Sequence, residues 1–90
     1  MRFEALPGVE DRLEDFLGDF AFTVRTEEGG CMSYLVTRPI GTQTHFVVHA
    51  RFADWGAFEL HSEAAHLERA MARLAPLLAA PLSMEIFAEL

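Results

Sequence analysis

The alternation of apolar and polar residues changes its period along the chain, and each change predicts a new element. Residues 1–6 alternate as a short strand does, and Pro7-Gly8 ends the run. From there to Gly29-Gly30, which favour a helix stop, the apolar residues recur with helical spacing. The predicted helix buries one stripe, made of Val9, Leu13, Phe16, Leu17, Phe20 and Val24.

Two predicted strands follow the glycines. Residues 31–37 are rich in β-branched and aromatic residues, and strict alternation puts Met32 and Tyr34 on one face and Cys31 on the other. Residues 44–52 form the clearest strand, with an apolar face that we expect under the helices. That face carries Phe46, Val48, Ala50 and Phe52, and the half-polar face carries His45, Val47, His49 and Arg51.

The second half of the chain predicts two helices and a last strand. Asp54 is placed to cap a short helix, and Ser62 to cap a second one that runs to about Ala75. The buried stripe of this second helix comprises Leu67, Ala70, Met71, Leu74 and Leu78. Residues 83–88 alternate again and predict a final strand.

This order predicts an α+β fold, a ferredoxin-like β-α-β-β-α-β sheet with both helices on one face, in a single domain over residues 1–90. The other face of the sheet is then uncovered. Because His45, Val47, His49 and Arg51 lie on it, we expect a second copy of the chain to cover it as a homodimer.

The composition limits the binding partners and the cellular location that we expect for the protein. The formal net charge is -7, lysine is absent, and the seven arginines are scattered among acids, so nucleic acid and anionic membranes are poor candidates. Cys31 is the only cysteine, which favours a reducing cytoplasm. No leader or membrane-spanning stretch is recognisable. A composition rich in alanine, leucine and arginine without lysine suggests a GC-rich bacterial genome.

Four histidines raise the possibility of metal binding or acid–base chemistry. His45 and His49 share a strand face but stand about 13 Å apart at roughly 3.3 Å per residue, too far to bind one ion, and we expect no metal. His61 and His66 are candidate bases for a phenolic proton near neutral pH. The alternative is that they are partly buried and only form hydrogen bonds. Glu27-Glu28 is interpreted as a solvated helix end.

The aromatic residues are numerous for so small a domain. Most belong to the core, but Phe52 and Trp55, near the junction of strand and helix, are candidates to line an apolar pocket. Tyr34 adds a hydroxyl if it faces that pocket.

Several segments together resemble the antibiotic biosynthesis monooxygenase family. They are Pro7-Gly8 with its helix, Glu28-Gly29-Gly30-Cys31 running into Tyr34, the strand Phe46-Val47-Val48 through Arg51-Phe52, and Phe58 with His61 and His66. The resemblance covers nearly the whole chain. It implies a dimeric α+β barrel in which Phe52, Trp55 and Phe58 are pocket walls and His61 and His66 are polar groups at the pocket. Phe52 stands where the family commonly has Trp, and Ala50 where it commonly has an acid.

The resemblance implies an oxygenase of phenolic or quinol-like small molecules that uses no flavin, haem or metal. A cofactor-independent monooxygenase with His61 or His66 as base is therefore the leading hypothesis. One alternative is a non-catalytic dimeric protein that binds a hydrophobic small molecule. Another is a purely structural dimer in which the aromatic side chains only form core.

Overall fold

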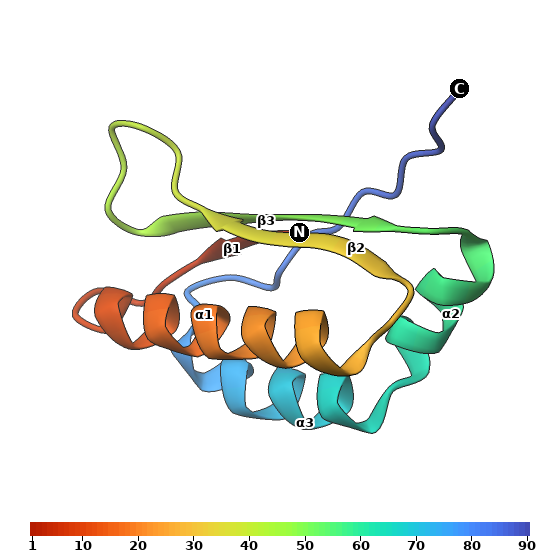
Figure 1. Ribbon diagram of the computed structural model, residues 1–90. Helices are drawn as coiled ribbons and strands as arrows, with labels where there is room; N and C mark the ends of the chain where they lie inside the picture. Colours follow the sequence, from red (N-terminus) through yellow and green to blue (C-terminus); the bar gives the residue numbers. More distant parts are fainter.

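The computed structural model describes all 90 residues, as one sheet with the helices on one side of it (Figure 1). The elements are β1 (Arg2–Glu4), α1 (Glu10–Glu27), β2 (Cys31–Thr37), β3 (His45–Phe52), α2 (Trp55–Glu63), α3 (Ala65–Leu74) and a 3₁₀ turn (Ala75–Leu77). The predicted α+β class and the order of elements up to the last helix are confirmed. None of the helices combines the length and the apolar composition that crossing a membrane requires.

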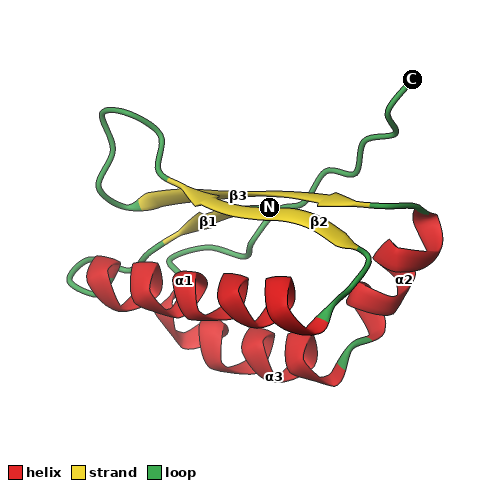
Figure 2. Cartoon of the chain, in the orientation of Figure 1, coloured by secondary structure: helices red, strands yellow, loops and turns green.

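The sheet is antiparallel, with strand order β1-β3-β2. Figure 2 shows α1 and α3 on the same side of the sheet, as the sequence predicts, with α3 below α1, while no element covers the opposite face. The core between the layers is built by the predicted stripe of α1 and the apolar face of β3. Its buried residues include Leu13, Leu17, Phe20, Val24, Phe46, Val48, Ala70 and Leu74.

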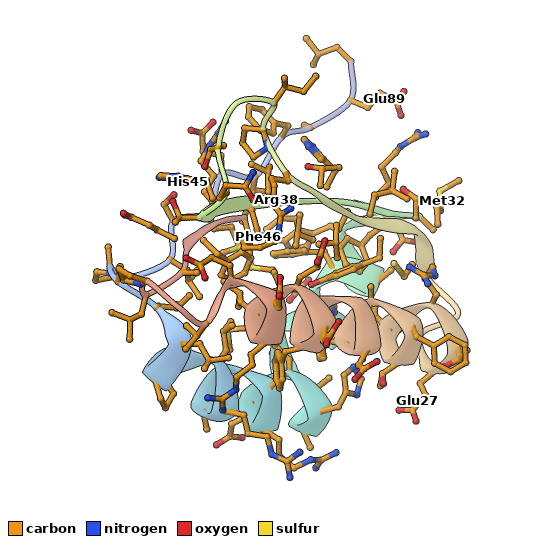
Figure 3. All side chains as sticks on the ribbon, turned by 90° about the vertical axis from the view of Figure 1, so that its left-hand side faces the viewer. Glu27, Met32, Arg38, His45, Phe46 and Glu89 are labelled. Atoms are coloured by element: carbon orange, nitrogen blue, oxygen red, sulfur yellow. The ribbon has the colours of Figure 1, made fainter.

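The predicted strand at residues 83–88 is wrong for this chain. Ser83 exchanges two backbone hydrogen bonds with Arg2, at 2.8 and 3.1 Å, and the pairing ends there. The reason is the length of β1, which has only three residues and offers no further partner. The remaining segment rises from the sheet on the side away from the helices (Figure 1), where Glu89 forms an exposed ion pair with Arg51 at 3.3 Å. Figure 3 shows the same separation, with Phe46 on the helix side and Glu89 on the opposite side.

The alternation predicted for β2 is interrupted at Met32. Cys31 lies opposite Phe52 and Ser33 lies opposite Arg51, so Met32 is an extra residue in a β-bulge. Its side chain is exposed. The bulge moves Cys31 onto the same face as Tyr34, and the prediction that put these two residues on opposite faces is therefore wrong.

The second helical region is capped only in part as predicted. Asp54 caps α2, because its Oδ1 accepts the Ala57 backbone N–H at 2.8 Å. Ser62 does not cap a helix. It lies inside α2 and donates its hydroxyl to the Glu59 carbonyl at 2.9 Å, whereas the extended backbone of Ala64 separates α2 from α3.

Gly30 is required by space. A Cβ atom at this position would lie 2.5 Å from the Cβ of Ala57, so α2 approaches the start of β2 closely only because position 30 has no side chain. This contact holds α2 against the start of β2. Gly18 in α1 has open space around its Cα and makes no comparable approach.

We expect Gly30→Ala to lower the free energy of unfolding by about 1–3 kcal/mol through overpacking against Ala57. Gly18→Ala is the matched control, and in an exposed helical position it should stabilise by about 0.5–1 kcal/mol. Urea unfolding followed by circular dichroism measures both. Equal effects of the two substitutions would contradict the close approach.

Candidate active site

Three side chains from the ends of three helices meet at one buried point. Glu28 caps the C-terminus of α1, His61 is in the last turn of α2, and His66 is in the first turn of α3. The Glu28 carboxylate oxygens lie 2.8 and 2.9 Å from His61 Nδ1, and Oε2 also contacts His66 Nε2. The side chains of Glu28, His61 and His66 are only 13, 6 and 17% exposed. The two predicted histidines are therefore brought together by a carboxylate.

The carboxylate also fixes which ring nitrogens carry hydrogen. An ionised carboxylate only accepts hydrogen bonds, so His61 Nδ1 and His66 Nε2 must each donate to Glu28. A neutral His61 then keeps Nε2 as a free acceptor. His66 Nδ1 faces the Glu27 carboxylate at 3.8 Å. The arrangement at His61 is the one by which a carboxylate orients a histidine base.

The interpretation of Glu27-Glu28 as a solvated helix end is half wrong. Glu27 is solvated, with 64% of its side chain exposed, but Glu28 turns inward. The sequence signal is the position of Glu28 just before Gly29-Gly30, where the chain reverses from α1 into β2 and carries the side chain towards α2 and α3.

Aromatic rings surround His61. Its ring centroid lies 4.9 Å from that of Phe52 and 6.0 Å from that of Tyr34. Phe20 lies 6.5 Å from His61 and 5.9 Å from His66. Glu28, His61 and His66, the polar trio, therefore lie against an aromatic wall made of Phe20 from α1 and Tyr34 and Phe52 from the sheet. The sequence predicts Tyr34 and Phe52 as pocket residues but not Phe20.

The other two predicted wall residues lie further out. Phe58 packs edge-on against Phe52 with ring centroids 5.7 Å apart, and Trp55 packs on Phe58 at 5.2 Å. Trp55 is 61% exposed. Ala50 is also exposed, although it shares the helix-side face of β3 with the buried Val48. The helices thus leave this end of β3 uncovered beside the aromatic wall.

A surface pocket lies elsewhere on the chain. It has a volume of about 400 Å³ and lies between β1, the turn after β2 and residues 80–83, with His45 and Phe46 in its wall. None of the predicted site residues lines it. His45 and His49 are exposed on the uncovered sheet face, as the sequence predicts.

Burial changes the acidity of two groups beside the trio. It raises the pKa of the Tyr34 phenol well above its usual value, with smaller contributions from the negative charges that Cys31 and Glu28 can carry. Burial also raises the pKa of the Cys31 thiol, and the Glu28 carboxylate acts in the same direction. Both groups are neutral at physiological pH, so Tyr34 is a phenol and Cys31 is not an activated nucleophile.

Comparison with known families decides the assignment. The sequence profile of the family described as antibiotic biosynthesis monooxygenase matches residues 1–73, which include the carboxylate and both histidines. The chain belongs to the antibiotic biosynthesis monooxygenase family. At family level this places it among the monooxygenases. No protein with a curated description matches the chain at a significant level.

Solved structures carry the same fold. The Rv0793 protein of Mycobacterium tuberculosis superposes with a TM-score of 0.88 at 25% identity, over 99% of this chain and 89% of that one. A candidate antibiotic biosynthesis monooxygenase of Caulobacter crescentus gives 0.83 at 24% identity, over 89 and 76%. A protein of unknown function from Nitrosomonas europaea gives 0.75 at 28% identity, over 98 and 90%. The ferredoxin-like architecture is thus that of the antibiotic biosynthesis monooxygenase family.

We expect this family member to lose stability as pH rises above about 10. There the unfolded chain releases the Tyr34 proton whereas the folded chain, with its raised phenol pKa, retains it, so folding is penalised by up to about 1.4 kcal/mol per pH unit. Lysine is absent and Tyr34 is the only tyrosine, which leaves Cys31 as the other side chain that titrates there.

Urea unfolding between pH 8.5 and 11 measures the slope. A Cys31→Ser background isolates the phenol, and adding Tyr34→Phe should remove the slope above about pH 10. An unchanged slope in Tyr34→Phe would contradict the assignment.

Proposed function

We propose that the chain is a cofactor-independent monooxygenase that oxidises a phenolic or quinol-like small molecule, with His61 as the base. The observation that supports this most directly is the contact of Glu28 with His61 Nδ1. It leaves Nε2 of the neutral ring unprotonated and ready to accept a proton. Membership of the antibiotic biosynthesis monooxygenase family supports the reaction class.

The aromatic wall supports the choice of substrate. Phe52 and Tyr34 lie against the His61 ring, and the exposed Ala50 marks the uncovered end of β3 beside them. A flat aromatic ring that enters there would stack on Phe52 and present its hydroxyl to His61. Because burial raises the pKa of the Tyr34 phenol, Tyr34 can donate a hydrogen bond to a bound phenolate without losing its proton.

The reaction balances without an external reductant. His61 Nε2 takes the phenolic proton, and the electron-rich phenolate transfers one electron to O₂. The resulting radical pair then recombines to a peroxide anion on the ring carbon, to which the His61 imidazolium returns the proton. Loss of water from the peroxide converts a hydroquinone and O₂ into a hydroxyquinone and H₂O, with all electrons supplied by the substrate. The residues bind, deprotonate and shield the substrate from water.

Glu28 and His66 are positioning residues in this proposal. Glu28 holds the His61 ring and stabilises the imidazolium that forms when Nε2 takes a proton. His66 holds the carboxylate from the other side. Each acts through another group and need not touch the substrate.

A non-catalytic binder of a hydrophobic small molecule is the second candidate. It is favoured by Ala50 and Phe52, which leave the wall at the open end of β3 apolar and without a polar group to orient a substrate. It uses the same aromatic wall and differs only in the absence of turnover.

We also propose that the chain acts as a homodimer, with the barrel closed by a second copy on the uncovered sheet face. Leu35 is 56% exposed there, opposite His49 in the ladder. The segment after Ser83 adds exposed apolar side chains on the same side of the sheet. The single cysteine is consistent with the cytoplasm as its location.

We expect oxygen uptake with a panel of hydroquinones to exceed the rate of autoxidation in buffer. His61→Ala should lower kcat by about 10²- to 10⁴-fold, because it removes the base. Glu28→Gln should lower kcat with KM unchanged and should shift the pH profile, because a neutral amide no longer stabilises the imidazolium. Oxygen electrode traces with product analysis measure these rates.

His45→Ala is the matched control for these rates, since it removes an exposed histidine of the opposite sheet face. It should leave them unchanged. An unchanged rate in the double variant His61→Ala, His66→Ala would remove the proposed base. Tight binding of a hydroquinone without oxygen uptake would favour the non-catalytic alternative.

Leu35→Glu should weaken self-association by at least about 10-fold, because it buries a charge at a proposed two-fold interface. Sedimentation velocity at micromolar concentration measures the dimer fraction. Leu60→Glu, on exposed α2, is the control and should remain dimeric. A wild-type chain that sediments as a monomer would overturn the dimer.

A further inference from the structure

We infer that Glu28, His61 and His66 form a binding site for one divalent transition-metal ion of the zinc type. The inference does not require the oxygenase activity proposed above. The candidate donors are a Glu28 carboxylate oxygen, His61 Nδ1 and His66 Nε2, and these atoms all lie within 4.8 Å of one another. Each donor comes from a different helix end, so the fold converges on one point.

The donor set matches the chemistry of zinc sites. Two imidazoles and one carboxylate supply three tetrahedral positions and leave a fourth for water or another oxygen ligand. With bonds of about 2.0–2.1 Å, such donors stand roughly 3.4 Å apart. Glu28 now lies 2.8 Å from His61 Nδ1 and also contacts His66 Nε2, so an ion needs the Glu28 side chain to withdraw from both ring nitrogens.

The charges around the donors favour a cation. Glu28 is largely buried beside two imidazole rings, and no arginine forms an ion pair with it. The second ring nitrogen of His66, Nδ1, faces the Glu27 carboxylate at 3.8 Å. A carboxylate behind a ligating histidine is the outer-shell partner that commonly orients such ligands. The site therefore has three donors and an additional negative charge beside one of them.

Metal binding would also change the role of His61. When Nδ1 ligates an ion, the proton of the neutral ring moves to Nε2, and the nitrogen available as a base becomes a donor. An occupied site and a free His61 base therefore exclude one another. The ion would act as an inhibitor of proton abstraction at this nitrogen.

The test uses the full chain freed of metal with EDTA. Titration with Zn²⁺ against a chromogenic chelator should give one ion per chain, and Co²⁺ should give the intense visible absorption of a tetrahedral site. Glu28→Gln and His66→Ala should each weaken Zn²⁺ binding by at least about 100-fold. The double variant His45→Ala, His49→Ala keeps the candidate donors and should bind as the wild type does.

A measurement on the wild-type chain keeps the test independent of variant folding. Zn²⁺ should shift the ring-nitrogen NMR resonances of His61 and His66 and leave those of His45 and His49 in place. Shifts confined to His45 and His49, or Zn²⁺ binding no tighter than in Glu28→Gln, would overturn the site. Zinc binding without oxygen uptake in any condition would leave the site standing and remove the oxygenase. Oxygen uptake by a chain that binds no zinc would do the reverse.

Discussion

One buried carboxylate holds the helical layer of this domain together at its end. Glu28 accepts hydrogen bonds from two imidazoles that belong to separate helices, so the ends of α1, α2 and α3 meet at a single charged group. Burying a carboxylate is costly unless its oxygens are satisfied, and here both have partners. The positions of α2 and α3 relative to the sheet, and therefore of the aromatic wall, depend on this contact.

The close approach at Gly30 also determines where α2 lies relative to Glu28. The carboxylate can reach α2 only because the chain after α1 passes within contact distance of Ala57. Gly30 permits that passage, and the Asp54 cap starts α2 at the right residue to place His61 in its last turn. Three features together determine the site: the Glu28 carboxylate, the absent side chain at Gly30 and the Asp54 cap. They lie near the start of β2 and the end of β3.

Sequence reasoning found what depends on periodicity and missed what depends on single contacts. The stripes of α1 and α3 and the apolar face of β3 follow from spacing alone, and they place the helices on one side of the sheet. The inward turn of Glu28 has no periodic signal, because it depends on where two later histidines lie. The bulge at Met32 and the unpaired segment after Ser83 likewise depend on partner strands, whose length and register a local pattern does not contain.

The bulge at Met32 has a bearing on how the chain avoids aggregation. With strand order β1-β3-β2, the outer side of β2 is a free edge whose backbone groups could pair with any passing strand. An extra residue near the start of β2 bends the strand and interrupts the regular spacing of those groups. A foreign strand can therefore form a regular hydrogen-bond ladder with this edge only over the later residues of β2, from Ser33 to Thr37. The bulge that interrupts the alternation of β2 thus also makes the edge of the sheet a poorer template for fibre growth.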